Sequence, residues 1–353
     1  MTATFLFLAL TITTAPDLQA VLDDQRLAQD VPGISAILIR SHEIVFAGGS
    51  GVADLETGQP VTADTVMYMG SLTKILTAVL ALQLVESGTL GLEDPVPGIA
   101  TGLKTDRPEI RVSHLLTHAA GLEREGNFGY WFSADFPDSV ALGEYLATAD
   151  LQFAPGSDRH YSNIGYAALG RVIEGASDQS YADALRDRVL EPLAMASTGV
   201  AGSDTIVSTG YTPRGKLIPS AERPFAGVGR RVGARRVRMY HDAQAMSPAF
   251  GAYTSARDLG RLALFLLGNG SDSVLSPKMR VRILERQASG WGLGLRIQRK
   301  NGRRSARHGG WFAAHRSHFL LDVDAGAGVV VLANSDNADT RRIADALMDA
   351  LLR

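Results

Sequence analysis

Apolar residues recur at helical spacing in several parts of the chain. The clearest run extends from Ile75 to Glu86, with apolar residues at 75, 76, 79, 80, 82 and 84, and it ends at Ser87-Gly88. Spacing of this kind, followed by a glycine, indicates a helix and its end. Similar patterns predict further helices at 19–28, 162–174 and 340–352.

Strand-like apolar runs lie near both ends of the chain. Near the N-terminus, predicted strands at 33–40 and 43–46 are joined by the tight turn Ser41-His42. Near the C-terminus, strands are predicted at 291–300, 303–308, 318–323 and 329–333, and Asn301-Gly302 is a favoured hairpin turn between the first two. Consecutive hairpins at both ends predict one antiparallel sheet, built from the N- and C-terminal segments and flanked by helices, which is an α/β (α+β) fold class.

The middle of the chain has a different pattern, mostly helical with long loops. We therefore predict an inserted, mainly helical domain over 67–245 and a sheet domain formed by 21–66 and 246–353. Substrates are usually held in the cleft between two such units, so we expect the active site there.

Composition removes several classes of function. The 353 residues carry a formal net charge of -2, which gives no indication of a nucleic-acid partner. The chain has no cysteine, which excludes disulfides, thiolate metal sites and a cysteine nucleophile. The lack of cysteine does not exclude any cellular compartment. The histidines show no close ligand spacing, and strand alternation would separate His308, His315 and His318. We therefore expect no metal and no other cofactor.

The N-terminus carries a possible targeting signal. Residues 3–15 form an apolar run as long as the core of a signal peptide and too short to span a bilayer comfortably. No lysine or arginine precedes Arg26, so the usual basic region is missing. We expect a signal peptide within 1–20 and export to the periplasm or medium, with a cytoplasmic protein as the alternative and no integral membrane span in either case.

Ser71-Leu72-Thr73-Lys74 places a hydroxyl one helical turn from an ammonium group, at the start of the predicted helix. This arrangement combines a nucleophile with a proton acceptor. The positive end of the helix dipole favours negative charge developing near the serine oxygen. A serine cap beside a solvated lysine is the alternative interpretation.

Two further motifs follow in the chain. Tyr161-Ser162-Asn163 opens a predicted helix after the turn-rich stretch 155–158. His308-Gly309-Gly310 follows the predicted hairpin, and its two glycines would let a substrate approach the strand backbone closely. Trp311 comes directly after the glycines, so we expect it to border the site. The alternative is a glycine-rich strand end without a function.

The three motifs, in this order, resemble those of the serine beta-lactamase and penicillin-binding protein superfamily, in particular its class C-like branch. That branch also contains esterases, D-aminopeptidases and D,D-carboxypeptidases. Three supporting stretches resemble the family as well: 115–122, 191–195 and 251–259. The resemblance implies an acyl-enzyme on Ser71, with Lys74 and Tyr161 sharing the removal of its proton and the ammonium lowering the phenol's pKa. It also implies that Asn163 orients Lys74 and the substrate, and that the oxyanion lies between the backbone N–H groups of Ser71 and Trp311.

His308 departs from the lysine of the beta-lactamase pattern. An imidazole with an ordinary pKa near 6.5 is mostly neutral at working pH, so the fixed positive charge for a lactam carboxylate is lost. We therefore expect a small-molecule or peptide-like ester or amide substrate, as for an esterase or D-amino-acid peptidase. A true beta-lactamase and a catalytically weak penicillin- or peptidoglycan-binding protein are the alternatives.

Two other features are ambiguous from sequence. The arginine-rich stretch from Arg230 to Arg238 is interpreted as a solvated loop, with contact to an acidic substrate group or to the opposite half of the cleft as the alternative. His118 is expected to be a structural residue near the cleft. The oligomeric state is not predicted.

Overall fold

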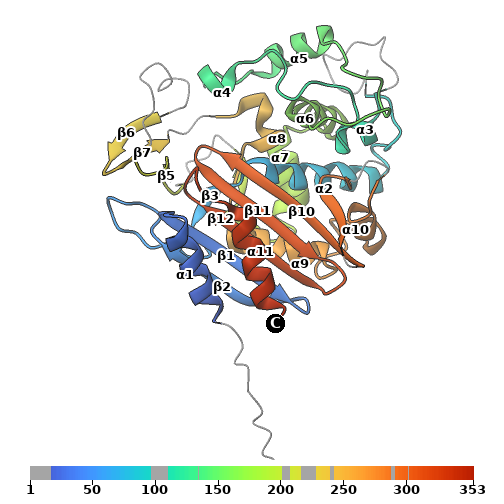
Figure 1. Cartoon of the computed structure of the whole chain (residues 1–353). Helices are drawn as coiled ribbons and strands as arrows, with labels where there is room; N and C mark the ends of the chain where they lie inside the picture. Colours follow the sequence, from blue (N-terminus) through green and yellow to red (C-terminus); the bar gives the residue numbers. More distant parts are fainter. Residues whose placement is uncertain are drawn as a thin grey trace, which may run out of the picture.

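A six-stranded antiparallel sheet forms the centre of the fold (Figure 1). The computed structural model describes residues 17–96, 110–133, 135–200, 207–215, 228–238, 242–287, 291–300 and 302–353. In the sheet the strands lie in the order β2-β1-β12-β11-β10-β9. Their bounds are β1 Gly33–Arg40, β2 Glu43–Gly51, β9 Arg296–Lys300, β10 Arg303–Phe312, β11 His315–Asp322 and β12 Ala327–Ala333. The predicted fold class is thereby confirmed, since β1 pairs directly with β12 and joins the two ends of the chain.

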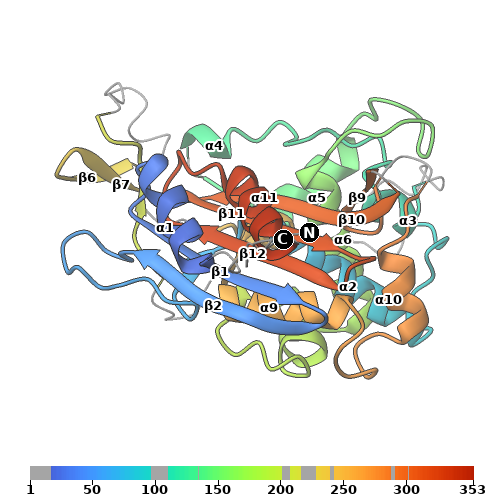
Figure 2. The same ribbon diagram turned by 60° about the horizontal axis from the view of Figure 1, so that its bottom comes forward.

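Helices cover both faces of this sheet. Helix α1 (Leu18–Ala28) and helix α11 (Thr340–Leu351) lie side by side on one face, as Figure 2 shows, and α9 (Ala256–Leu266) packs on the other. Strand β1 is buried on both sides because its apolar side chains alternate between two cores. Ile34, Ala36 and Leu38 pack toward α1 and α11, whereas Ile37 and Ile39 face the larger core.

The larger core contains helix α2 (Thr73–Glu86), which is buried on nearly every side. Around and beyond it lie the 3-10 turn η1 (Gly70–Leu72), the π turn η2 (Arg186–Leu190), the 3-10 turn η4 (Gln244–Met246) and the remaining helices: α3 (Val112–Leu116), α4 (Tyr130–Ser133), α5 (Ser139–Thr148), α6 (Asn163–Ser177), α7 (Tyr181–Leu185), α8 (Ser247–Phe250) and α10 (Pro277–Ile283). The boundaries of the predicted helical and sheet domains stay predictions.

Two small sheets accompany the helices, and neither was predicted from the sequence. One has the order β3-β8-β4, with β3 Val66–Tyr68, β8 Ala252–Ser255 and β4 Gly199–Val200. The other has the order β5-β7-β6, with β5 Gly210–Tyr211, β7 Arg235–Arg238 and β6 Val228–Val232. Their strands are too short to show a period of two in the sequence.

Several boundaries differ from the predictions. Strand β10 continues to Phe312 and β11 begins at His315, so the glycine pair lies inside a strand and its interpretation as a strand end is wrong. Ala313 and Ala314 form the turn, with φ angles of 47° and 59°. The predicted turn at 301–302 includes Asn301, which lies outside the described residues, but β9 and β10 pair antiparallel on either side of it.

The predicted targeting segment also lies largely outside the described residues, which begin at Asp17. Export therefore stays a prediction. Within the described part of the chain, every helix is too short or too polar to cross a membrane.

Candidate active site

Ser71 lies in the 3-10 turn η1, which leads directly into α2. Gly70 enters this turn with a φ of 53°, a conformation that favours glycine. A side chain at Gly70 would also meet the backbone of Trp311, since its Cβ would lie 2.4 Å from the Trp311 nitrogen. Glycine at this position therefore brings the Ser71 turn against the backbone of β10.

Lys74 lies in the first turn of α2, and its side chain is completely buried. Its Nζ donates to the Asn163 Oδ1 and to the Ala249 carbonyl, both at 2.7 Å, and lies 3.4 Å from the Ser71 Oγ. The alternative of a solvated lysine is therefore wrong. Burial lowers the pKa of Lys74 well below its ordinary value, and the nearby Glu125 carboxylate opposes part of that effect.

Asn163 is the first residue of α6, and the preceding Ser162 caps that helix by accepting from the Gly165 N–H at 2.8 Å. The Asn163 side chain has two different neighbours. Its oxygen accepts from Lys74, and its Nδ2 donates to both carboxylate oxygens of Glu125 at 2.9 Å. The Tyr130 hydroxyl donates to the same carboxylate. Glu125 thus holds the amide with its oxygen turned toward the lysine.

Tyr161 is partly buried beside these groups, and the Lys74 Nζ lies 4.8 Å from the centre of its ring. Burial raises the pKa of the Tyr161 phenol well above its ordinary value, and the neighbouring Ser71 hydroxyl offsets only part of the increase. The expectation that the ammonium lowers the phenol's pKa is therefore wrong. The hydroxyl is buried and has no partner of normal hydrogen-bond geometry among the described residues.

His118 lies behind Tyr161, with ring centres 4.5 Å apart. Its Nδ1 accepts from the Ser162 backbone N–H at 3.2 Å. This contact ties the loop that carries Tyr161 to the preceding segment, as expected of a structural residue near the cleft.

His308 lies on β10, buried next to Tyr161 and Trp291. Its Nδ1 bonds the Gly309 carbonyl at 2.8 Å. Burial, together with the charge of Lys74, lowers the pKa of His308 to about 3. The sequence-based value near 6.5 is therefore wrong, because it assumes a solvated imidazole. His308 and His318 project from opposite faces of the β10–β11 hairpin, since His308 pairs with Phe319 and His318 pairs with Gly309.

The two glycines of the third motif have different surroundings. A Cβ at Gly310 would lie 2.0 Å from the Met69 carbonyl oxygen and 2.3 Å from the Ser317 Oγ. At Gly309 the nearest atom would be 3.5 Å away, which is an ordinary contact. Gly310 is therefore required for packing within the protein, and only Gly309 matches the expected role of leaving room for a substrate.

Trp311 borders the site, with 38% of its surface exposed. Its ring stacks on Trp131 at 5.3 Å between centres, and its Nε1 donates to the Asp336 Oδ1 at 2.7 Å. The Arg316 guanidinium lies 5.6 Å from the ring centre. Trp311 is thus part of an aromatic wall with polar groups on its outer side.

Residues of all three motifs line one cavity of about 910 Å³. Its walls include all the predicted site residues except Lys74, which lies beneath them: Ser71, Tyr161, Asn163, His308, Gly309, Gly310 and Trp311. Other walls come from residues that the sequence analysis missed: Arg124, Glu125, Trp131, Arg316 and the segment 336–341. Arg124 and Glu125 could have been suspected from the sequence, because they lie just after the family-like stretch 115–122. No sequence pattern marks the segment 336–341 as part of the site. Among the described residues, no cluster of histidine and carboxylate side chains is suited to a metal ion.

Known proteins share both sequence and fold with this chain. Esterase EstB of Burkholderia gladioli is 33% identical over 215 residues, which cover 54% of this chain and 52% of that protein. The D-alanyl-D-alanine-carboxypeptidase/endopeptidase AmpH of Escherichia coli K12 is 30% identical over 47% of this chain and 44% of that protein. The chain thus spans about half the length of the curated relatives it matches.

A solved structure, the D-amino acid amidase of Ochrobactrum anthropi SV3, superimposes with a TM-score of 0.78 at 24% identity, covering 95% of this chain and 98% of the other. The octameric penicillin-binding protein homologue of Pyrococcus abyssi gives 0.77 at 25% identity and covers 95% and 76%. The family model described as Beta-lactamase matches residues 18–352. This chain, with its buried lysine beneath Ser71, therefore belongs to the beta-lactamase family, in its class C-like branch.

Proposed function

We propose that this protein is a serine hydrolase that cleaves a neutral ester or amide through a covalent acyl-serine intermediate on Ser71. The observation that carries the proposal is the approach of the buried Lys74 Nζ to within 3.4 Å of the Ser71 Oγ, at the wall of a large cavity. The kinship with an esterase and with a D-amino acid amidase supports this choice of substrates.

Lys74 is the general base in this proposal. Burial acts on Lys74 and Tyr161 in opposite directions, favouring the free amine of the lysine and the protonated form of the phenol. The free amine accepts the Ser71 proton while the Oγ attacks the substrate carbonyl. The resulting oxyanion lies between the backbone N–H groups of Ser71 and Trp311.

Tyr161 is the acid in the second half of acylation. Its phenol donates a proton to the oxygen or nitrogen of the leaving group as the bond to the acyl carbon breaks. The Lys74 ammonium then returns a proton to the phenol, so both groups regain their starting states. Water attacks the acyl-serine in the same manner and releases the acid.

Asn163 orients the base. Its oxygen fixes the Nζ position, and the contact with Glu125 prevents the amide from turning over, because the reversed amide would point its nitrogen at the lysine and its oxygen at a carboxylate. The Ala249 carbonyl holds the Nζ from a second direction. These contacts direct the amine toward Ser71.

The charges around the cavity favour a substrate without a carboxylate. His308 is neutral, and each arginine at the walls is already engaged by another group. Arg124 pairs with Glu125 at 3.0 Å, Arg341 with Asp345 at 3.7 Å, and the Arg316 Nε donates to the Asp336 carbonyl at 3.1 Å. Arg316 keeps its charge because its partner is a neutral carbonyl, but an anionic beta-lactam bound at Ser71 would also meet the Glu125 carboxylate.

Labelling with a fluorophosphonate and with a fluorescent penicillin tests the proposal, together with hydrolysis of p-nitrophenyl butyrate. We expect Ser71→Ala to abolish labelling and to lower ester hydrolysis by about a thousandfold or more, because the covalent intermediate is lost. Ser87→Ala, which alters the exposed serine at the end of α2, is the matched control and should behave as wild type.

Three other outcomes contradict the proposal. If Ser71→Ala keeps a tenth of the wild-type activity, Ser71 is not the nucleophile. Labelling without turnover of any ester or amide would indicate a penicillin-binding protein. Preference for penicillins or cephalosporins over neutral esters at pH 7.5 would indicate a true beta-lactamase.

A further inference from the structure

Arg235 is a buried cation on a small outer sheet. It lies on β7 of the β5-β7-β6 sheet, which appears in yellow at the edge of the molecule in Figure 1. Only 4% of its side chain is exposed, whereas Arg231 on the neighbouring strand is exposed. The interpretation of the whole stretch from Arg230 to Arg238 as a solvated loop is therefore wrong, because Arg235 reaches inward. The side chains of Arg230 and Arg238 lie outside the described residues.

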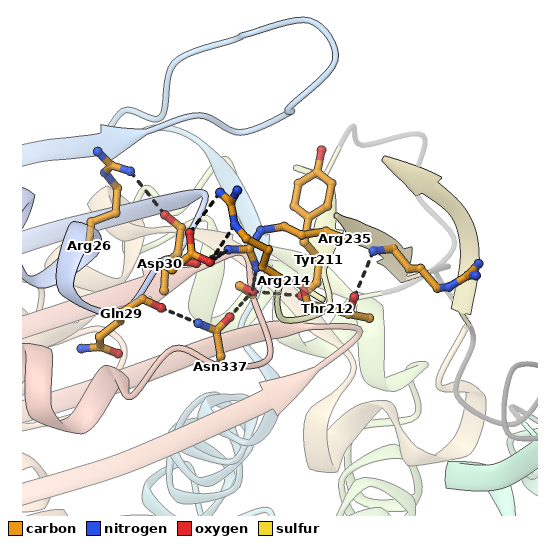
Figure 3. A network of polar contacts seen from close by, with 11 residues as sticks. Arg26, Gln29, Asp30, Tyr211, Thr212, Arg214, Arg235 and Asn337 are labelled. Carbon is orange, nitrogen blue, oxygen red and sulfur yellow. Dashed lines mark hydrogen bonds and ion pairs between the residues drawn. The ribbon is translucent and has the colours of Figure 1, made fainter. Parts of the chain in front are cut away.

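The Arg235 guanidinium joins three segments that are distant in sequence (Figure 3). Its Nη2 pairs with the Asp30 carboxylate at 2.8 Å and also donates to the Asp30 carbonyl, at the end of α1. Its Nη1 donates to the Thr212 carbonyl at 2.9 Å and contacts the Ser335 Oγ at 3.4 Å. Arg214 approaches the same Asp30 carboxylate from the exposed side, at 3.1 Å.

The segment 334–337, which follows β12, is fixed by the same network. The backbone N–H of Tyr211 on β5 donates to the Asn334 carbonyl at 3.0 Å, and the Tyr211 carbonyl accepts from the Asp336 backbone N–H at 3.1 Å. The Ser335 Oγ donates to the Asn337 Oδ1 at 2.6 Å, and the Asn337 amide donates to the Gln29 carbonyl. The segment is therefore held by the outer sheet on one side and by the end of α1 on the other.

The opposite side of this segment forms a wall of the active-site cavity. The Asp336 carboxylate accepts from the Trp311 Nε1 at 2.7 Å, and its carbonyl accepts from the Arg316 Nε at 3.1 Å. Asp336 is the hydrogen-bond partner that fixes the orientation of the exposed Trp311 ring. A shift of Asp336 would remove this hydrogen bond and leave the ring held by Trp131 and Arg316 alone. Ser71 and Lys74 would stay in place, because those residues are held by different contacts.

We infer that Arg235 is a positioning residue for substrate selection: by fixing the segment 334–337 it holds Asp336, and Asp336 sets the Trp311 ring at the acyl-binding wall. The effect on catalysis rests on the proposed function, but the effect on Trp311 does not. In this inference the acyl group of the substrate lies along the Trp311 wall, where a butyryl chain extends further than an acetyl group does. The predicted consequence is therefore a loss of selectivity for longer acyl chains.

The test compares Arg235→Gln in the wild-type chain and in a Trp311→Phe chain, which lacks the indole N–H. The measured quantities are kcat/KM for p-nitrophenyl butyrate relative to acetate, and quenching of tryptophan fluorescence by acrylamide. We expect Arg235→Gln to lower the butyrate-to-acetate ratio by about fivefold to tenfold and to increase quenching, in keeping with typical couplings between linked sites. In the Trp311→Phe chain, both changes should disappear.

Arg231→Gln removes an equal charge from the same sheet, and Arg214→Gln removes the exposed partner of Asp30, so both controls should leave the ratio and the quenching unchanged. If Arg235→Gln does not fold, Arg235→Lys replaces it. The lysine keeps a charge beside Asp30 but cannot bond Thr212 and Ser335 at the same time, and it should give the same changes in weaker form.

The inference is overturned if the substitution at Arg235 has equal effects with and without the Trp311 indole, or if Arg231→Gln matches it. Failure of the proposed function would look different. Ester hydrolysis would then be absent from the wild type, while the difference in acrylamide quenching between the two backgrounds would still decide whether Arg235 positions Trp311.

Discussion

Replacing Gly310 by alanine, with Gly309→Ala as the matched control, tests how β10 and η1 hold the site together. The two positions are adjacent in one strand and receive the same methyl group. At Gly310 the methyl would lie 2.0 Å from the Met69 carbonyl oxygen, at the point where the Ser317 Oγ also donates to that oxygen at 2.7 Å. At Gly309 it would meet nothing closer than 3.5 Å.

The magnitude follows from these distances. Side-chain Cβ atoms do not approach other atoms closer than 3.0 Å, so β10 and the Met69 carbonyl must separate by about 1 Å in Gly310→Ala. Overpacking of this kind costs about 1–3 kcal/mol, and loss of the Ser317 hydrogen bond adds about 1 kcal/mol. We therefore expect the free energy of unfolding to fall by roughly 2–4 kcal/mol, against less than about 0.5 kcal/mol for Gly309→Ala.

Catalysis should suffer even where the variant is folded. The proposed oxyanion donors are the N–H groups of Ser71 on η1 and Trp311 on β10, and these are the two elements that the methyl forces apart. A misplacement of about 1 Å costs on the order of a hundredfold in rate. The two variants and the wild type are compared by their free energies of unfolding in urea. They are also compared by kcat for p-nitrophenyl acetate, measured under conditions in which each protein is folded. If Gly310→Ala matches wild type in both measurements, or if the two alanines lower the free energy of unfolding equally, the close packing of β10 on η1 does not organise the site.

Four further predictions concern proton transfer and charge. Lys74→Ala and Tyr161→Phe should each cause large losses in kcat, and the double variant should be little worse than either, because both groups serve one cycle of proton transfer; near-additive losses would show that the two groups act independently. The preference in kcat/KM for neutral esters over anionic beta-lactams should stay constant from pH 8 to pH 5, because His308 stays neutral until about pH 3, and a narrowing near pH 6.5 would contradict its buried state. His308→Lys should raise kcat/KM for beta-lactams by about tenfold to a hundredfold at pH 7.5, the value of one charged hydrogen bond, and an unchanged constant would show that the carboxylate binds elsewhere. Burial lowers the pKa of His315 to about 4, so as pH falls the unfolded chain takes up a proton before the folded protein does. The free energy of unfolding should therefore decrease between pH 6.5 and pH 4, by up to about 3 kcal/mol from this group. His315→Gln should make this decrease smaller, as measured by urea unfolding at each pH.

Local patterns were sufficient to predict the six-stranded sheet, the helices α1, α2, α6 and α11, and the motif residues. Helical spacing places Ser71 and Lys74 one turn apart in any helix, and hairpin signals at both ends predict the sheet, because each depends only on neighbouring residues. Glu125 and Asp336 were not predicted, since they reach the cavity on loops whose course depends on tertiary packing. The difference between Gly309 and Gly310 was equally inaccessible, because it depends on which of the two faces the Met69 carbonyl.

The ionisation of the site could not be predicted for a related reason. Sequence provides the ordinary pKa values, but burial changes them by amounts that depend on every neighbour. A single cause, the removal of water, lowers the pKa of Lys74 and raises that of Tyr161. The sequence-based expectation assigned the dominant effect to the mutual attraction of the two groups, which would require an ion pair in the buried site.

In the proposed mechanism Lys74 and Tyr161 are both neutral in the resting enzyme, and this has a consequence for catalysis. An ammonium beside a phenolate would place two charges in a buried site before any substrate arrives, and desolvating them costs several kcal/mol unless their geometry is excellent. A free amine beside a phenol avoids that cost, and charge develops only as the Ser71 proton moves to Lys74 and negative charge builds on the substrate. The cation then forms close to the oxyanion, and the Glu125 carboxylate behind Asn163 stabilises it. The electrostatic attraction therefore stabilises the transition state and not the resting enzyme. Stabilisation of the transition state alone raises kcat.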